Sequence, residues 1–162
     1  MRSAISKEAC RLVCLAARVA GERLESLCDK LISKDGLLKI INSGNKIIAE
    51  NGNDCIITLI ENVRSPKIIT RIVDEFQSKN TAVRQKISVY LKMIIESYSD
   101  SIIEKYATPL ENAIALVIAD ANKEVRQNTR QAFLIYQNKF PQKAAKMLTK
   151  FESSVQKALV EE

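Results

Sequence analysis

The sequence repeats itself in two stretches, Ser78-Lys79-Asn80-Thr81-Ala82-Val83-Arg84 and Asp120-Ala121-Asn122-Lys123-Glu124-Val125-Arg126. In both, a polar cap-like residue and a short loop precede a helix that opens with Val-Arg. The two arginines lie 42 residues apart. A period of that length is typical of helix–loop–helix units stacked one on another. The repeat therefore predicts an all-α protein, an α-solenoid with units of about forty residues.

The same position can be sought upstream of Arg84. Asn45-Lys46 lies 38 residues before it, and Lys7 lies 39 residues before Lys46. A cation is thus expected at the start of the second helix of four successive units. Equivalent positions line up along one edge of a solenoid, and helix N-termini add partial positive charge there. The inter-helix loops on that edge would present Arg2 and Ser3, Asn45 and Lys46, Lys79 and Asn80, and Asn122 and Lys123.

Two of these cations have a structural alternative. In HEAT-type repeats an Asp and an Arg six positions apart often bond between neighbouring units as a ladder that holds the stack. Asp120 and Arg126 have this spacing, and Ser78 and Arg84 are a weaker relative of it. Arg84 and Arg126 are therefore either ladder residues or contacts to a partner. Lys79 and Lys123 lie in the loops themselves, where the alternative is a solvated charge.

Helical periodicity runs along the whole chain, and no segment shows the two-residue alternation of a strand. Ser65-Pro66 predicts a helix start, with Ser as N-cap and Pro at the first helical position. Gly21 is expected to end the first helix, Asn51-Gly52 to kink or break one, and Thr108-Pro109 to bend or break another. Helices are expected at about 5–20, 22–41 with a break near 33–36, 45–63, 66–76, 81–98, 102–119, 122–138, 142–149 and 152–161.

Composition supports one helical domain covering residues 1–162. Only three prolines and four glycines occur in 162 residues, fewer turn residues than a β-sandwich or barrel of this size needs. No apolar run reaches the eighteen residues of a membrane span, and charges enter where a signal peptide would turn apolar. The net charge of +6 favours an acidic partner. No membrane association is expected, and the location is expected to be cytoplasmic.

The residues that carry enzyme chemistry are missing or isolated. The sequence has no histidine, which removes the commonest general base and the usual catalytic triads. Gly36, Gly44 and Gly52 stand alone, outside any phosphate-binding loop pattern. The cysteines lack the C-x-x-C pairs of zinc sites and are expected to be buried in a reducing cytosol. No catalysis, cofactor or metal is expected; the four cysteines are Cys10, Cys14, Cys28 and Cys55.

Beyond the repeat, several segments occur in an order and at a spacing that can be compared with those of known families. They are Ser6-Lys7-Glu8-Ala9-Cys10, Asn42-Ser43-Gly44-Asn45-Lys46, the two stretches quoted above, Ala132-Phe133, Tyr136, Phe140-Pro141, Ala144-Ala145 and the terminal 151–159. Their order and spacing resemble the TOG domain of the cytoplasmic linker-associated protein (CLASP) family of microtubule regulators. The resemblance covers nearly the whole chain.

The resemblance implies a flat paddle of HEAT units whose loops bind curved αβ-tubulin along one narrow edge. It implies a non-catalytic tubulin- or microtubule-binding module that regulates microtubule dynamics on the cytoskeleton. The residues that would meet tubulin are Arg2, Ser3, Lys46, Lys79, Arg84, Lys123 and Arg126. They coincide with the cation row that the spacing predicts.

The chain departs from the family at its start. A full domain has six HEAT units, and its first loop usually offers a Trp, whereas this sequence has no Trp. About five units are expected here, the first of them partial. The apolar face at residues 9–20 would then be exposed and could pair with another chain.

Two other functions use the same features. A HEAT scaffold could bind another acidic or helical protein partner without binding tubulin. The basic edge could instead bind nucleic acid, which is disfavoured because aromatic residues for stacking are few and no nucleic-acid-binding motif is present.

Overall fold

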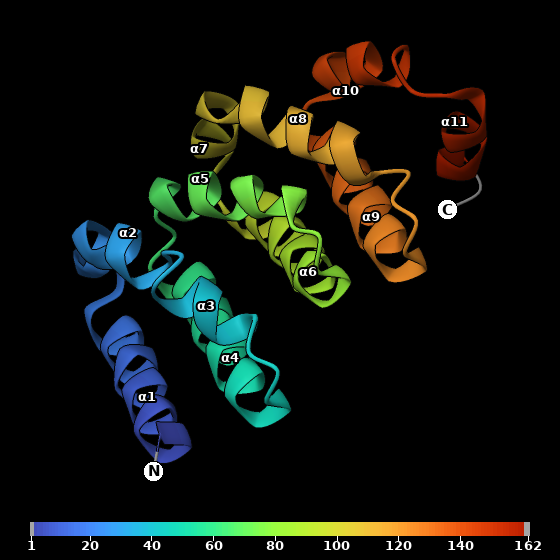
Figure 1. Ribbon diagram of the computed structural model, residues 1–162. Helices are drawn as coiled ribbons and strands as arrows, with labels where there is room; N and C mark the ends of the chain where they lie inside the picture. The colour runs from blue at the N-terminus through green and yellow to red at the C-terminus, as the bar shows by residue number, and fades with distance from the viewer. Residues whose placement is uncertain (1, 161–162) are drawn as a thin grey trace. The chain divides into compact units, whose positions relative to one another are not determined.

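The computed structural model describes residues 2–160, apart from the side chains of Arg2 and Ser3, and contains helices and no strand over that range (Figure 1). The chain divides into two compact units, one ending at Arg71 and the other beginning at Ile72. No helix within residues 2–160 is long and apolar enough to cross a membrane. The helices are α1 (Arg2–Ala20), η1 (Gly21–Leu27), α2 (Cys28–Leu31), α3 (Leu37–Ile41), α4 (Lys46–Asn62), α5 (Pro66–Asp74), η2 (Glu75–Gln77), α6 (Thr81–Ser97), α7 (Asp100–Lys105), α8 (Ala107–Val117), α9 (Lys123–Lys139), α10 (Pro141–Leu148) and α11 (Ser153–Val160).

In the first unit α1 and α4 pack side by side and begin at the same end (Figure 1). Their contact includes the Cys55 thiol, which donates to the carbonyl oxygen of Cys10 at 3.7 Å. Ala17 of α1 and Ile56 of α4 are fully buried at 0% exposure. The short helix α3 packs against α4 as well. The apolar faces of these amphipathic helices are buried against one another, and this burial holds the unit together.

All four cysteines are free thiols inside this unit, and Cys14 is the only one of them that is not fully buried. Burial raises the pKa of the Cys10, Cys28 and Cys55 thiols above its usual value. A buried thiol that stays protonated is a poor nucleophile. Cys10, Cys28 and Cys55 therefore act as small apolar side chains in the core, as the sequence predicts, whereas Cys14 is only partly buried.

Two predicted helix boundaries are confirmed in this unit. Gly21 has a φ of +53° and directly follows the last residue of α1, a backbone conformation that glycine adopts without strain. The hydroxyl of Ser65 accepts from the backbone N–H of Lys67 at 3.2 Å, with Pro66 as the first residue of α5. Both boundaries follow from local sequence alone.

The break predicted as one alternative at Asn51-Gly52 is wrong, because α4 continues through both residues. Gly52 is buried against α3, and a Cβ placed on it would lie 2.6 Å from Cγ2 of Ile40 and 3.2 Å from Cγ2 of Ile41. The glycine therefore permits close approach of two helices. Packing against α3 outweighs its unfavourable helix propensity of about 1 kcal/mol.

Gly52→Ala is expected to lower the free energy of unfolding by about 1 kcal/mol. Overpacking a tight contact costs roughly 1–3 kcal/mol, and the gain in helix propensity offsets part of that loss. Gly44→Ala is the matched control, because a Cβ at Gly44 meets nothing within 4 Å. Urea unfolding of both variants tests the contact. A Gly52→Ala protein as stable as Gly44→Ala would contradict it.

In the second unit α6 and α9 pack side by side and begin at the same end (Figure 1). Three polar contacts join the helices along their length. Gln85 Nε2 donates to Glu124 Oε2 at 2.8 Å, Asn128 Nδ2 to Ser88 Oγ at 3.1 Å, and Lys92 Nζ to Gln131 Oε1 at 2.9 Å. The two partners of each contact are 39 or 40 residues apart in the sequence, close to the repeat period of about forty residues.

The helix α8 packs against α9, and Tyr136 Oη donates to Glu111 Oε1 at 2.6 Å. Burial raises the pKa of the Tyr136 phenol, and the hydrogen bond to the Glu111 carboxylate raises it further. The phenol therefore stays neutral and keeps its proton as a donor. The bond ties the side chains of two successive helices together.

The break predicted at Thr108-Pro109 lies two to three residues earlier, at Tyr106, between α7 and α8. Pro109 is the third residue of α8. The first N–H groups of a helix have no intrahelical partner, so proline costs little there. Pro141 begins α10 for the same reason, and Phe140 is the C-cap of α9.

Candidate functional site

Three long helices begin with the same side-chain cap. The side-chain oxygens of Asn45, Asn80 and Asn122 accept from backbone N–H groups in the first turns of α4, α6 and α9. The acceptor–donor distances are 3.0 and 3.2 Å for Asn45, 3.0 Å for Asn80, and 3.0 and 3.1 Å for Asn122. Each cap satisfies N–H groups that the helix leaves unpaired.

A second polar residue supports each cap from two positions upstream. The side chain of Ser43 accepts from the Asn45 N–H at 3.2 Å, and Ser78 accepts from Asn80 at 3.3 Å. Asp120 does the same for Asn122 at 2.8 Å. The loops thus share one backbone shape, defined by Ser or Asp, any residue, then Asn. We call the segments 43–46, 78–81 and 120–123 the capped loops.

The caps correct the predicted repeat register. Lys46 directly follows its cap residue, Asn45. Arg84 and Arg126 each lie four residues after their own cap residues, Asn80 and Asn122. The equivalent of Lys46 is therefore Lys123, and the predicted equivalence of Lys46 with Arg84 is wrong. The Ser/Asp-x-Asn pattern was the sequence signal that gives the right alignment.

Arg84, in the first turn of α6, forms a partly buried ion pair with Asp120 of the capped loop 120–123. Arg84 Nε donates to Asp120 Oδ2 at 2.9 Å, and Arg84 Nη2 donates to Asp120 Oδ1 at 3.3 Å. The side chains are only 16% and 10% exposed. The geometry is bidentate, which is the strong form of this interaction. The pair fixes one capped loop against the next.

The charge of Asp120 is stabilised from several sides. Burial alone would raise the pKa of its carboxyl group. Hydrogen bonds from Arg84 and from the Asn122 N–H, with the nearby charges of Arg84 and Arg126, outweigh burial and hold that pKa below its usual value. Asp120 is therefore an anion at neutral pH.

Each arginine also closes its own loop. Arg84 Nη1 donates to the carbonyl oxygen of Ser78 at 2.8 Å, and Arg126 Nη1 donates to that of Asp120 at 2.7 Å. Arg126 also reaches the carbonyl of Ala121 at 2.8 Å. Both guanidinium groups hold loop backbone, six residues back along the chain. The Arg84–Asp120 contact is thus of the ladder type, because it joins residues of successive repeats. The carboxylate of Asp120 bonds to Arg84 of the preceding repeat, whereas Arg126 bonds to the backbone carbonyl of Asp120.

The lysines of the capped loops are placed differently. Lys46, Lys79 and Lys123 are exposed, and within the described part of the chain none of them takes part in an ion pair. In the second unit Lys79 and Lys123 belong to adjacent loops that the Arg84–Asp120 pair joins. This arrangement presents ammonium groups on a fixed backbone, which suits an acidic surface.

The remaining predicted site residues fall at the start of α1. The backbone of Arg2 and Ser3 forms its first turn, and their side chains lie outside the described residues. Lys7 is exposed further along the same helix. Since α1 and α4 begin at the same end, these residues lie toward the end of the first unit that carries Lys46.

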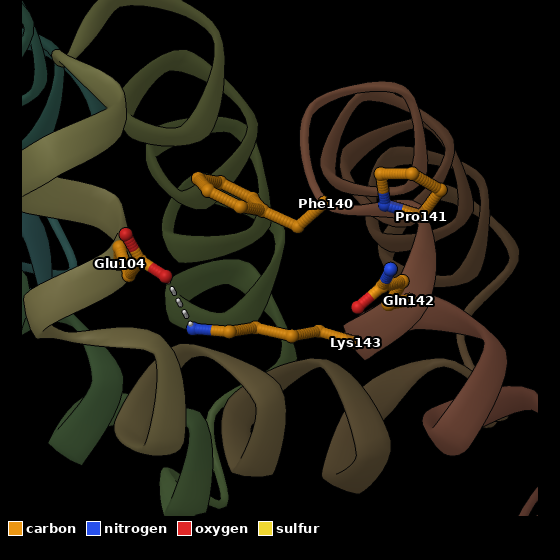
Figure 2. Close-up of a pocket in the computed structure, with 5 residues that line it drawn as sticks. All are labelled: Glu104, Phe140, Pro141, Gln142 and Lys143. Atoms are coloured by element: carbon orange, nitrogen blue, oxygen red, sulfur yellow. Dashed lines mark ion pairs between the residues drawn. The ribbon is translucent and has the colours of Figure 1, made fainter.

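A shallow hollow of about 270 Å³ lies where α9 meets α10, walled by α7 (Figure 2). Lys143 Nζ pairs with Glu104 Oε1 at 3.3 Å and lies 5.7 Å from the centre of the Phe140 ring. The acid and the base in this hollow neutralise one another, and Pro141 and Gln142 complete its wall. No group of His, Cys, Asp and Glu residues within the described range could hold a metal ion.

Residues 1–160 match the family model described as CLASP N terminal. A CLIP-associated protein of Arabidopsis thaliana is 26% identical over 99% of this chain, and protein stu1 of Aspergillus fumigatus is 30% identical over 94%. A CLIP-associating protein of Drosophila melanogaster is 23% identical over the full chain. The chain spans only 11–12% of the length of these relatives.

A solved structure described as "Crescerin uses a TOG domain array to regulate microtubules in the primary cilium" superposes with a TM-score of 0.72. The alignment covers 96% of this chain and 65% of that one, at 16% identity. At this identity the likeness shows the fold alone. The predicted fold class, an all-α solenoid of HEAT repeats like that of a TOG domain, is thereby confirmed.

Proposed function

Since this chain belongs to the CLASP N-terminal family, we propose that it is a non-catalytic module that binds αβ-tubulin or microtubules and regulates microtubule dynamics. Its relatives carry the names of CLIP-associated proteins. The solved structure that it resembles belongs to crescerin, which is described as using a TOG domain array to regulate microtubules. The proposal concerns this module only, because the chain spans about a tenth of those relatives. Its site of action would be the cytoskeleton of the cytoplasm.

The observation that carries the proposal is the set of exposed lysines on capped loops. Lys46, Lys79 and Lys123 sit at or beside the N-termini of three helices, where the helix dipole adds positive charge. In the proposed mechanism these ammonium groups dock on acidic tubulin. Complementary charges mainly raise the association rate and fix orientation. Binding would therefore weaken as salt increases.

The other site residues have supporting roles in this proposal. Asn45, Asn80 and Asn122 fix the helix starts, and Arg84 and Arg126 hold the loop backbone in place. Contacts from Arg2 and Ser3 are proposed from the family resemblance. We also propose that the chain self-associates through the apolar face of α1, independently of tubulin.

Lys79→Glu combined with Lys123→Glu is expected to weaken tubulin binding at least about tenfold. Each reversal replaces an attraction by a repulsion of similar size, and close charge pairs at interfaces contribute about 1.5 kcal/mol or more. Gel filtration of the chain with soluble tubulin, and co-sedimentation with microtubules, measure the loss at low and moderate salt. Wild-type binding should fall as salt rises.

The matched control is Lys105→Glu combined with Lys150→Glu, which makes the same change in net charge at exposed lysines outside the capped loops. It should bind tubulin nearly as wild type does. Equal behaviour of the two double variants would refute the loop site. If wild type binds neither tubulin nor microtubules, the chain is better described as a scaffold for another acidic or helical partner. A duplex-DNA shift assay tests nucleic-acid binding alongside.

A further inference from the structure

The helix α1 exposes an unusual amount of apolar surface. Ile5, Leu12, Leu15 and Val19 are 66%, 62%, 57% and 80% exposed. These four are half of the large apolar side chains that are exposed within the described residues, and one helix carries all of them. The opposite face of α1, with Cys10 and Ala17, is buried against α4. The exposed residues therefore form a second apolar face of α1 rather than the edge of the first.

The exposed face has the spacing of a helix–helix seam. Ile5, Leu12 and Val19 recur every seven residues, and Leu15 lies three after Leu12. In the a/d pattern with which one helix packs along another, Ile5, Leu12 and Val19 take the a positions and Leu15 takes a d position, while the other d position is Glu8. From Ile5 to Val19 the seam extends about 21 Å, at about 1.5 Å per residue. It is long enough for a partner helix to bury all four side chains.

A hollow lies at the N-terminal end of this seam. Its walls are Ala4, Ile5, Glu8, Ala9 and Leu12, and its volume is about 440 Å³. The lining combines the small side chains of Ala4 and Ala9 with the larger ones of Ile5 and Leu12. A leucine or valine side chain from a facing helix fits such a hollow, in the manner of a knob entering a hole.

The geometry points to a second copy of this chain as the occupant, docked antiparallel along α1. The row of Ile5, Leu12 and Val19 reads the same from both ends, because Leu12 lies seven residues from each of the other two. A twofold axis at Leu12 packs the two copies of Leu12 against each other and places Val19 of each copy beside Ile5 of the other. The same axis places Leu15 of each copy opposite Ala9, which lines the hollow. Such an interface uses the same surface twice, as twofold dimers do.

Charges along the seam favour the antiparallel direction. Glu8, which pairs with Arg11 at 3.4 Å, lies toward one end, and the exposed Arg18 lies toward the other. An antiparallel copy places Glu8 of each chain near Arg18 of its partner. A parallel copy would place like charges on like at both positions, which is destabilising. The inference rests on the self-association proposed above and adds its direction and contacts.

Sedimentation equilibrium of the 162-residue chain should show a reversible, concentration-dependent dimer. One helix seam is smaller than a standard interface of about 800 Å² per partner, so a dissociation constant in the micromolar range is expected. Leu15→Glu should raise that constant about tenfold or more, because each dimer loses two buried leucines and gains two buried charges. Leu116→Glu is the control, since Leu116 is also 57% exposed but belongs to α8.

A charge exchange tests the direction separately. Glu8→Arg and Arg18→Glu should each weaken the dimer, and the double variant should restore it. A dimer that Leu15→Glu disrupts but the exchange does not restore would keep self-association and overturn the antiparallel geometry. A chain that stays monomeric would overturn both self-association and its antiparallel direction, and so would a dimer that Leu116→Glu weakens as much as Leu15→Glu. The apolar face of α1 would then be available to a helix of another polypeptide. Circular dichroism of each variant verifies folding.

Discussion

Asp120→Ala is expected to lower the free energy of unfolding by about 3 kcal/mol. Removing one partner of a buried ion pair costs about 3–5 kcal/mol, and the partial exposure of Arg84 and Asp120 places the loss at the lower end. The variant also removes the acceptor for the Asn122 N–H. Since one carboxylate supports two capped loops, tubulin binding should weaken with Lys79 and Lys123 untouched. Urea unfolding and the tubulin assay measure the two effects.

The control is Asp100→Ala, which breaks the Asp100–Lys139 pair at 3.1 Å; the Asp100 side chain is 66% exposed, and its loss should cost under about 1 kcal/mol. Acid adds an independent test. The folded-state pKa of Asp120 is lowered, so its contribution to stability is present above the unfolded pKa of about 4 and is lost as pH falls through the folded value. Asp120→Asn should therefore lose less stability than wild type on acidification below about pH 4. Equal acid sensitivity of the two proteins would contradict this account.

Phe133→Ala should destabilise the second unit by about 4 kcal/mol, the largest effect expected of any single change considered. Phe133 is fully buried, and its ring meets that of Phe151 edge-on with centroids 5.4 Å apart. The substitution leaves a cavity and removes the ring contact that joins α9 to the segment before α11. Thermal and urea unfolding measure the loss.

Leu116→Ala is the comparison for Phe133→Ala, because Leu116 is more than half exposed and its truncation leaves no cavity. It should change stability by less than about 1 kcal/mol. A loss below about 2 kcal/mol for Phe133→Ala would mean that neighbouring side chains collapse into the space. Restoration of stability by Phe133→Leu would identify apolar volume, rather than the ring contact, as the main contribution.

Local sequence determines most of the helices, because their boundaries depend on residues that act over one turn. Ser65-Pro66 and Gly21 act in this way, and both boundaries are confirmed. Gly52 could not be interpreted so, because its role depends on Ile40 in another helix. Pro109 was ambiguous for a different reason. Proline breaks a helix interior but is tolerated in a first turn, and the sequence did not show which position it would hold.

The residues of the candidate site could be predicted from the sequence, but not which of them face a partner and which hold the loops in place. Spacing identified the loops around Lys46, Lys79 and Lys123. It also aligned Lys46 with Arg84, because a period of about forty residues tolerates an error of three positions. The hydrogen bonds of Asn45, Asn80 and Asn122 show the true alignment, which the Ser/Asp-x-Asn pattern in the sequence also carries. Whether an arginine faces a partner or its own loop depends on tertiary contacts such as Arg84–Asp120.

The middle position of each capped loop has a consequence for how such surfaces change. The hydrogen bonds that shape these loops use the residues on either side, so Gly44, Lys79 and Ala121 can occupy the same place. A substitution there alters what the surface offers while leaving the scaffold intact. At these three positions a substitution can therefore change which partner is preferred without lowering the stability of the fold. Selection can adjust each contact independently of folding.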